Sequence, residues 1–319
     1  MTKPKIILTR RWPEKVEAVL AERYDAEFNR DDKAMSAGEL RAALNLYDAV
    51  LPTVTDKMTA EVLEHPSRTK ILGNFGVGFN HIDVEAAKAA GLVVTNTPGV
   101  LTDATADIAL TLLLNVARRT YEGETMLRAG EWTGWRPTQL MGTGPQGKTL
   151  GIIGMGRIGK AMAKRCHHAL DMKVIFYDAF PVADPGVPAE QRETVDQVLE
   201  EADFVSLHCP GGGDNIHLIN AERLKKMKPT AFLVNSARGD IIDEAALVEA
   251  LKAGEIAGAG LDVFEREPAV TEELLKLQNV ALLPHLGSAT TETREAMGMT
   301  VVENIDAFFA GKEPPNRVA

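Results

Sequence analysis

The segment from residue 149 to residue 178, TLGIIGMGRIGKAMAKRCHHALDMKVIFYD, constrains the fold more than any other part of the chain. It begins with a short apolar run, 149–153, that is typical of a buried parallel strand. A helix is expected next, because apolar residues from 158 to 169 recur at helical spacing. A second strand is expected at 173–177. Between the first strand and the helix lie three glycines with the spacing GxGxxG: Gly154, Gly156 and Gly159.

Each of these glycines has a physical role in binding a dinucleotide. Gly154 permits the tight turn from strand to helix, Gly156 lets the backbone approach a pyrophosphate, and Gly159 lets the helix pack closely on the strand. The start of the helix, at Arg157 and Ile158, adds free N–H groups and the positive end of the helix dipole. The alternative is a glycine turn with a structural role only.

The second strand of this unit is followed by Asp178, about 20 residues beyond the glycines, where a carboxylate can accept hydrogen bonds from a ribose diol. No arginine follows Asp178 to bind the extra phosphate of NADPH, because the next residues are Ala179 and Phe180. The strand, the glycines, the helix and the acid together predict a dinucleotide site with NAD as the cofactor.

Length and composition limit the classes of protein. With 319 residues, the chain is long for a single core, so two domains are expected. The formal net charge of −10, without a long basic run, argues against nucleic acid as a partner. The two cysteines, Cys166 and Cys209, are too few for a zinc cluster, and free thiols fit a reducing compartment. No segment has the length of a membrane span, so we expect a cytoplasmic protein that binds neither membrane nor metal.

The residues before 101 predict a smaller α/β unit, because short strands alternate with helices. Strands are expected at 5–8, 49–51, 71–72 and 92–95, with helices that begin at Pro13, at Ser36 (a capping box with Glu39) and at Asp83. The loop GNFGVG, residues 73–78, is either a flexible turn or an anion-binding nest. In a nest, the N–H groups of Val77 and Gly78 would hold a carboxylate.

Residues 101–119 predict one long helix whose apolar surface is wider than a single face, as in a connecting or interface helix. The following stretch, 130–147, has no clear period and is expected to form an extended arm that carries Trp132 and Trp135. The helix and the arm both need burial, which predicts a homodimer. The alternative is that both tryptophans pack within their own chain.

Beyond Asp178, strands and helices continue to alternate, which predicts a doubly wound parallel Rossmann sheet of six strands. The further strands are expected at 203–208, 230–235, 257–262 and 280–283, and the helices at 189–200, 221–227, 244–253, 272–277 and 291–309. The last helix is long enough to return to the N-terminal unit. We therefore expect an α/β protein with a NAD-binding Rossmann domain, 101–286, and a smaller flavodoxin-like substrate-binding domain, 1–100 plus 287–319.

Ligands of doubly wound sheets bind outside the carboxyl ends of the strands. The predicted strand ends bring a cation, acids and an imidazole to one edge: Asp178, Cys209, Pro210, Ser236, Ala237, Arg238, Asp262 and His285. Glu267 lies five residues beyond Asp262, near the same edge. Taken one by one, such residues are more often surface ion pairs or turn formers than catalytic groups.

Three segments, NSARGDIID, GLDVFEREP and LLPHLGSAT, resemble the motifs of the D-isomer-specific 2-hydroxyacid dehydrogenases. The resemblance extends over essentially the whole chain, including GVGFNHID and NTPGVLTDATADIA. Within the family, GEWTGWRPT and GSATTETR are most similar to glyoxylate/hydroxypyruvate reductases. The resemblance implies NAD(H)-dependent reduction of a small 2-keto acid, glyoxylate or hydroxypyruvate, to the D-2-hydroxy acid.

The resemblance also implies a role for each catalytic residue. Arg238 would bind the keto acid with its planar, permanently charged guanidinium. His285 would donate a proton to the carbonyl oxygen as hydride arrives at the carbon, and Glu267 would orient the imidazole. The backbone of Val77 and Gly78 would take the substrate carboxylate.

Further residues are implied at the cofactor and at the substrate. Asp262 would contact the nicotinamide carboxamide, and Cys209 would line the cofactor pocket, because no base is evident to activate its thiol. Trp135 would reach the substrate pocket of the partner subunit. The other positions implied at the cofactor are Thr105, Pro210, Ala237, Arg238, His285 and Gly287, besides the glycine motif and Asp178.

Several alternatives stay open. The same machinery could act on another D-2-hydroxyacid or on 3-phosphoglycerate, although the regulatory domain that phosphoglycerate dehydrogenases often append is not expected here. Formate is disfavoured, because formate dehydrogenases of this superfamily carry glutamine where Glu267 stands. A protein of another class, an NAD-sensing corepressor, shares the fold and these motifs, but such proteins tend to carry long disordered tails.

Overall fold

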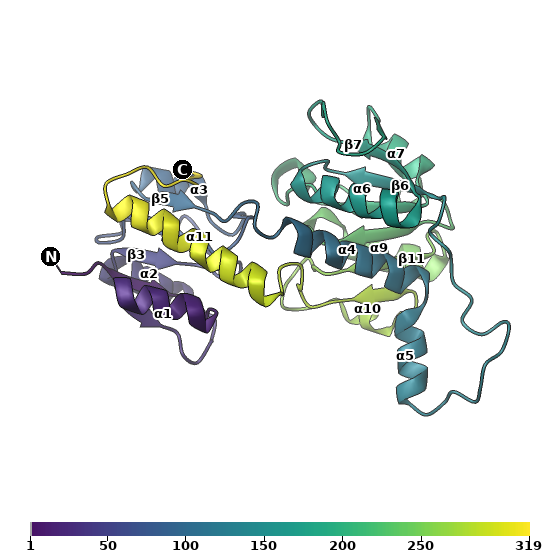
Figure 1. Cartoon of the computed structure of the whole chain (residues 1–319), viewed down its shortest axis with the longest axis horizontal. Helices are drawn as coiled ribbons and strands as arrows, with labels where there is room; N and C mark the ends of the chain where they lie inside the picture. The colour runs from purple at the N-terminus through teal and green to yellow at the C-terminus, as the bar shows by residue number, and fades with distance from the viewer. Residues whose placement is uncertain (1) are drawn as a thin grey trace. The chain divides into compact units, whose positions relative to one another are not determined.

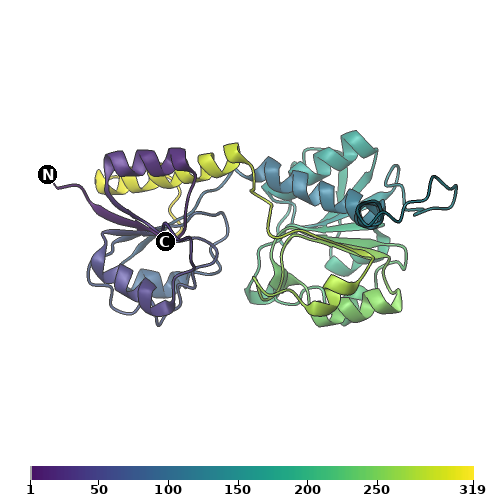
Figure 2. The ribbon, with the colours of Figure 1, turned by 90° about the horizontal axis from the view of Figure 1, so that it is seen from below.

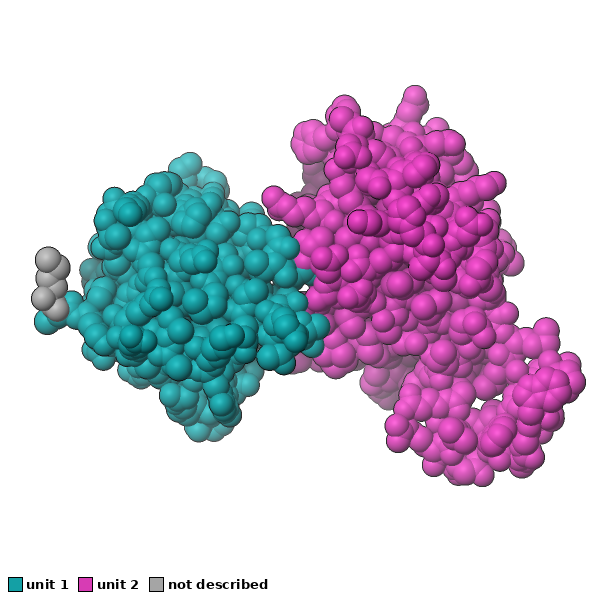
Figure 3. Space-filling view, in the orientation of Figure 1, with its two compact units in different colours: residues 1–101, 289–319 teal, residues 102–288 magenta. Residues whose placement is uncertain are grey.

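The computed structural model describes residues 2–319. The chain forms two compact units, one of Met1–Leu101 with Ala289–Ala319 and the other of Thr102–Ser288, shown in two colours in Figure 3. Each unit is a parallel sheet with helices on both faces (Figure 1). The predicted fold class, a doubly wound Rossmann sheet with a smaller flavodoxin-like unit, is confirmed.

The smaller unit has five strands in the order β2-β1-β3-β4-β5, which is the flavodoxin-like order. Helices α1 and α11 cover one face of this sheet, and α2 and α3 cover the other (Figure 2). The strands are β1 (Lys5–Leu8), β2 (Asp25–Phe28), β3 (Ala49–Leu51), β4 (Ile71–Gly73) and β5 (Val93–Thr95). The helices are α1 (Glu14–Arg23), α2 (Ala37–Leu46), α3 (Val84–Ala89) and α11 (Thr291–Phe309).

Local sequence signals explain how these helices begin and pack. Ser36 and Glu39 form the predicted capping box of α2, and Asp83 caps α3. The last helix, α11, returns to this unit as predicted and packs on α1. A Cβ on Gly298 of α11 would lie 2.8 Å from the side chain of Val16, so glycine permits this close approach.

The larger unit has seven strands in the order β12-β11-β10-β9-β6-β7-β8, with the switch in strand order between β6 and β9. Helices α4 and α6 pack on one face, and α7, α8, α9 and α10 on the other. The strands are β6 (Thr149–Ile153), β7 (Lys173–Tyr177), β8 (Ala189–Gln191), β9 (Phe204–Leu207), β10 (Phe232–Asn235), β11 (Gly258–Leu261) and β12 (Val280–Leu282). The helices are α4 (Thr102–Ala117), α5 (Thr120–Arg128), α6 (Arg157–Leu170), α7 (Val195–Glu201), α8 (Ala221–Leu224), α9 (Glu244–Ala253) and α10 (Glu272–Lys276).

The helix predicted over 101–119 is confirmed as α4, whereas the separate helix α5 that follows it was not predicted. Helix α4 ends at Ala117, and α5 begins at Thr120, after Arg119 adopts a left-handed conformation with φ 54°. The carbonyl of Ala117 accepts a hydrogen bond from the N–H of Thr143, 2.7 Å away, where the chain returns from the arm. This tertiary contact replaces the continuation of the helix.

The helix predicted over 189–200 begins too early. Residues Ala189–Gln191 form β8 and pair in parallel with β7, and α7 begins only after Thr194, which caps it. Strand pairing outweighs the helix propensity of this short segment. The extra strand makes seven instead of the six predicted. Strand β2 was also missed.

No helix within residues 2–319 is both long enough and apolar enough to cross a membrane.

Candidate active site

The glycine turn joins β6 to α6 and leaves room for a ligand. Gly154 has φ 95°, and a Cβ there would lie 2.5 Å from the backbone that follows β9. A Cβ on Gly159 would lie 2.2 Å from the carbonyl oxygen of Gly154, so glycine permits the helix to approach the strand. At Gly156, a Cβ would meet no atom of the described chain within 4 Å, and no side chain caps α6. The first N–H groups of α6, at Arg157 and Ile158, therefore suit a pyrophosphate.

Asp178 follows β7 and lies against the glycine turn. Its Oδ2 accepts a hydrogen bond of 2.8 Å from the N–H of Met155, and its Oδ1 accepts one of 3.1 Å from the N–H of Phe180. These two bonds fix the carboxylate beside the start of α6, where the ribose of a dinucleotide is recognised in this fold.

Strand β10 ends at Asn235, and the buried amide of this residue shapes the turn that carries Arg238. Its Oδ1 accepts a hydrogen bond of 3.0 Å from Ala237, and its Nδ2 donates one of 2.8 Å to the carbonyl of Arg238. Burial lowers the pKa of the Arg238 guanidinium, against the opposing effect of the Glu267 and Asp240 carboxylates. An arginine remains charged despite such a shift. Asn235 was not predicted as a site residue, although it is the first residue of the NSAR segment at the end of a predicted strand.

The imidazole of His285 is paired with the carboxylate of Glu267. Nδ1 of His285 lies 2.8 Å from Oε2 of Glu267, while Oε1 accepts a hydrogen bond of 3.0 Å from the N–H of Phe264. Burial raises the pKa of Glu267, but the hydrogen bond and the charge of His285 outweigh it, so that the pKa is lowered overall. Nε2 of His285 has no hydrogen-bond partner in the described chain, and the side chain is 32% exposed. This nitrogen is therefore available to a ligand.

The turn that begins at His285 is held by Asp262, which follows β11. The carboxylate of Asp262 accepts hydrogen bonds from the N–H groups of Leu286, at 2.6 Å, and Gly287, at 2.8 Å. Thr105 of α4 donates a hydrogen bond of 3.0 Å to the carbonyl of Gly287. Burial raises the pKa of Asp262. Asp262 and Thr105 thus fix the turn in which His285 has φ 54°, and their contacts with a cofactor stay predictions.

Three polar groups near the same edge have distinct environments. The hydroxyl of Ser236 is buried without a hydrogen-bond partner in the described chain, which suits a bound ligand. Burial lowers the pKa of His208 to about 4, so this histidine is neutral and is no proton donor near pH 7. Burial raises the pKa of the Cys209 thiol to about 11, which fits a lining residue and not a nucleophile. Contacts of Cys209 and Pro210 with the cofactor stay predictions.

The predicted carboxylate-binding residues, Val77 and Gly78, belong to the smaller unit, in the loop after β4. Their N–H groups find no acceptor among residues 2–319, whereas their carbonyls accept hydrogen bonds from asparagine side chains. This orientation of the peptide groups favours an anion-binding nest over a flexible turn.

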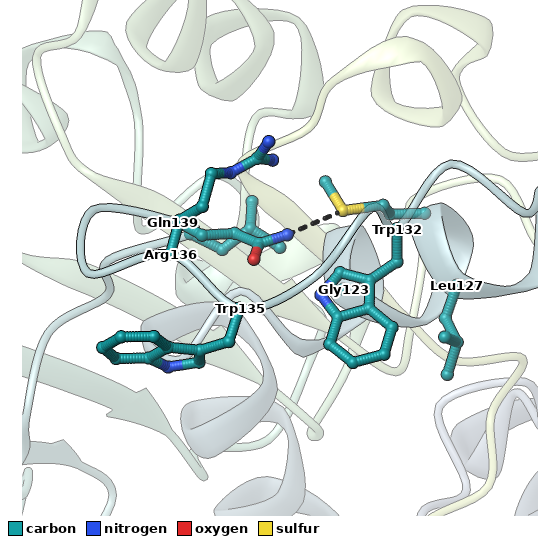
Figure 4. A pocket seen from close by; sticks show the side chains of 8 residues that line it. Gly123, Leu127, Trp132, Trp135, Arg136 and Gln139 are labelled. Atoms are coloured by element: carbon teal, nitrogen blue, oxygen red, sulfur yellow. Dashed lines mark hydrogen bonds between the residues drawn. The ribbon is translucent and has the colours of Figure 1, made fainter.

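The arm and α5 form a separate apolar hollow in the larger unit. Trp132 and Trp135 are 52% and 79% exposed, and both line a hollow of about 350 Å³ together with Leu127 of α5 (Figure 4). The amide of Gln139 donates a hydrogen bond of 3.1 Å to the sulfur of Met126. No residue of α5 is buried. Neither tryptophan is buried by its own chain in this structure, and the homodimer stays a prediction.

Residues 2–319 contain no group of three or more His, Cys, Asp or Glu side chains placed to hold a metal ion.

The strand order and the glycine turn place the larger unit among the dinucleotide-binding Rossmann domains, and the acid–base pair at its edge suits a dehydrogenase. Residues 110–287 match the profile described as D-isomer specific 2-hydroxyacid dehydrogenase, NAD binding domain. The chain belongs to this family of oxidoreductases, which use a nicotinamide cofactor.

Relatives and solved structures agree with this assignment. A glyoxylate reductase from Thermococcus litoralis is 48% identical over 99% of this chain and 97% of its own length. The crystal structure of a Thermus thermophilus protein has a TM-score of 0.92 at 43% identity, covering 99% of this chain and all of that one. An NADPH-dependent glyoxylate/hydroxypyruvate reductase from Sinorhizobium meliloti, solved with NADP and malonate, has a TM-score of 0.87 at 36% identity, covering 100% and 97% of the two chains.

Proposed function

We propose that this protein reduces glyoxylate or hydroxypyruvate to the corresponding 2-hydroxy acid, in the D form where the product is chiral. The observation that carries the proposal is the His285–Glu267 pair, at 2.8 Å, with Nε2 of the imidazole unpaired within the described chain. Relatives named glyoxylate reductase, 42–48% identical over nearly the whole chain, support this substrate class.

In the proposed mechanism, His285 is the general acid. Its protonated Nε2 donates to the carbonyl oxygen of the keto acid, while Glu267 stays ionised and stabilises the positive ring through Nδ1. Arg238 binds the keto acid and polarises its carbonyl with a charge that survives burial. The N–H groups of Val77 and Gly78 take the substrate carboxylate. In the reverse direction, His285 accepts the proton.

The residues of the larger unit fit a nicotinamide dinucleotide. The open space at Gly156 and the uncapped start of α6 suit the pyrophosphate, Asp178 suits the adenosine ribose, and the buried Ser236 hydroxyl lacks a partner in the described chain. When bound in the reduced form, the cofactor supplies the hydride that adds to the carbonyl carbon. We propose NAD as the preferred form, because the Asp178 carboxylate would repel a 2′-phosphate. By the same reasoning from the family, Thr105, Cys209, Pro210, Ala237, Asp262 and Gly287 would line this site.

We further propose that residues 1–101 with 289–319 bind the substrate, that residues 102–288 bind NAD, and that the protein is a cytoplasmic homodimer. The exposed tryptophans of the arm support dimerisation, and Trp135 would then contribute to the substrate pocket of the partner subunit.

The direct test follows NADH absorbance with a panel of 2-keto acids: glyoxylate, hydroxypyruvate, pyruvate and 3-phosphohydroxypyruvate. We expect the highest kcat/KM with glyoxylate or hydroxypyruvate, and the variant His285→Ala serves as the control for contaminating activity. A preference for 3-phosphohydroxypyruvate would assign the same machinery to another substrate. Binding of NADH without turnover of any keto acid would contradict an enzymatic function and favour an NAD sensor.

A further inference from the structure

The loop of residues 76–78 has all three of its carbonyls turned towards the protein. Nδ2 of Asn74 donates hydrogen bonds of 3.1 Å to the carbonyls of Gly76 and Gly78. Nδ2 of Asn96 donates one of 2.8 Å to the carbonyl of Val77, and the N–H of Thr97 donates a second bond to Gly76.

This arrangement decides which way the peptide dipoles point. In a trans peptide group, the carbonyl of one residue and the N–H of the next residue point in opposite directions. A carbonyl that is hydrogen-bonded to the protein therefore turns the N–H of the next residue away from that contact. The N–H groups of Val77 and Gly78 have no acceptor within residues 2–319. The two asparagine side chains therefore aim these donors away from the core, where an anion can reach them.

Asn96 is itself anchored by a closed ring of hydrogen bonds with two other asparagines, Asn304 of α11 and Asn316. The N–H of Asn96 donates to the carbonyl of Asn316, at 3.1 Å, and the N–H of Asn316 donates to Oδ1 of Asn304, at 3.0 Å. Nδ2 of Asn304 closes the ring by donating to the carbonyl of Asn96, at 3.1 Å. Asn304 is fully buried.

This cycle of hydrogen bonds involves only the N–H and the carbonyl of Asn96, so the side-chain amide of Asn96 can donate to the carbonyl of Val77. Residues 316–319 also run along β5, where the N–H of Val318 donates to the carbonyl of Val94 at 2.7 Å. The position of the Asn96 amide is thus fixed by α11 and by the segment that follows it, which are more than 200 residues away in sequence.

We propose that Asn96 is a positioning residue for the substrate carboxylate, with Asn304 and Asn316 as its support. It does not touch the substrate. By holding the carbonyl of Val77, it orients the N–H of Gly78 towards the anion, while Asn74 and Thr97, which hold the carbonyl of Gly76, orient the N–H of Val77. The proposal rests on the proposed function, in which this loop binds the carboxylate of the keto acid. The proposal predicts that substitutions in the hydrogen-bonded cycle of Asn96, Asn304 and Asn316 lower substrate affinity and leave cofactor affinity unchanged.

The test is the variant Asn96→Ala, which removes one side-chain hydrogen bond and no charge, while the backbone bonds of the ring remain possible. Losing a bond worth about 1 kcal/mol raises the KM for glyoxylate about fivefold. We expect the dissociation constant of oxamate, a non-reducible keto-acid analogue, to rise by the same factor. The kcat and the dissociation constant of NADH should stay within about twofold of wild type, because the transition-state chemistry belongs to other residues.

A matched control distinguishes this role from general loosening of the unit. Asn45 is in the same unit, outside the loop of residues 76–78. Its Oδ1 accepts hydrogen bonds from the N–H and the hydroxyl of Ser67, and its Nδ2 donates one to the carbonyl of Arg41. Asn45→Ala should leave the KM for glyoxylate and the oxamate affinity unchanged. A second variant, Asn304→Ala, should raise both constants in the same direction as Asn96→Ala.

The outcomes separate this inference from the function on which it rests. If wild type neither reduces glyoxylate nor binds oxamate, the proposed function fails. The positioning role of Asn96 is wrong if wild type reduces glyoxylate and binds oxamate and Asn96→Ala has the same KM and the same oxamate affinity as wild type. This comparison requires that Asn96→Ala and Asn45→Ala have the same melting temperature. A parallel loss of NADH affinity in Asn96→Ala would also contradict it.

Discussion

Nδ1 of His285 lies 2.8 Å from Oε2 of Glu267, and this contact leaves Nε2 as the imidazole nitrogen without a hydrogen-bond partner in the described chain. Two carboxylates fix the position of this imidazole. Glu267 contacts Nδ1 of the side chain, and Asp262 accepts hydrogen bonds from the backbone of the turn that follows His285. The lowered pKa of Glu267 keeps its carboxylate ionised at neutral pH. A negative charge at Nδ1 favours the protonated ring that reduction needs.

Alanine substitutions at two glycines of the GxGxxG motif, Gly159 and Gly156, should have different effects on stability and on cofactor affinity. Gly159→Ala places a Cβ 2.2 Å from the Gly154 carbonyl and should destabilise the fold by about 1–3 kcal/mol, with a lower melting temperature. Gly156→Ala meets open space at an ordinary φ of −74°, so the melting temperature without cofactor should stay near that of wild type. NADH affinity should nevertheless fall, because the new methyl group would occupy the proposed pyrophosphate site. Thermal melts and NADH titration of both variants make the comparison, and unchanged NADH affinity in Gly156→Ala would exclude that site.

Asp178 should make the enzyme prefer NADH to NADPH. Its carboxylate is fixed by Met155 and Phe180, and the repulsion of a 2′-phosphate should cost at least ~1.4 kcal/mol, or about tenfold in kcat/KM. Asp178→Asn should narrow the ratio of kcat/KM for the two cofactors. Equal kcat/KM of wild type with NADPH and NADH would contradict the predicted preference. The comparison of the two cofactors is informative because one structural relative is NADPH-dependent.

The arm should mediate dimerisation. Trp135 is 79% exposed and α5 has no buried residue, so we expect light scattering to give the mass of a dimer. Trp135→Ala should weaken the dimer, with dissociation at higher protein concentration than wild type. Leu275→Ala, which removes another exposed apolar side chain outside the arm, is the control and should not. An active wild-type monomer would rule out the dimer.

The sequence predicted the parts of the fold that depend on local patterns. Apolar runs gave the strands on both sides of the glycine turn, and the capping box at Ser36 gave the start of α2. The strand at Ala189–Gln191 and the break after Ala117 could not be predicted locally, because pairing with β7 and the contact with Thr143 decide them.

The candidate site shows the same division. His285, Glu267 and Arg238 were predicted because they stand in recognisable motifs at strand ends. Asn235 and Asn96 were missed, since an asparagine that orients a backbone carbonyl leaves no spacing pattern in the sequence. Their roles follow only from hydrogen bonds to residues that are brought close by folding.

The most direct test of the account is the pH dependence of kcat/KM for glyoxylate reduction in wild type, His285→Ala and Glu267→Gln. His285→Ala loses the proton donor, so activity should fall by about two to four decades at every pH. Glu267→Gln retains a hydrogen-bond acceptor but loses the charge that favours the protonated imidazole. Without that charge the cationic ring that reduction uses is less stable, so reductive activity should decline at lower pH than in wild type and should recover as the pH is lowered. An alkaline limb in Glu267→Gln that coincides with that of wild type would contradict the proposed pairing of Glu267 with the catalytic acid.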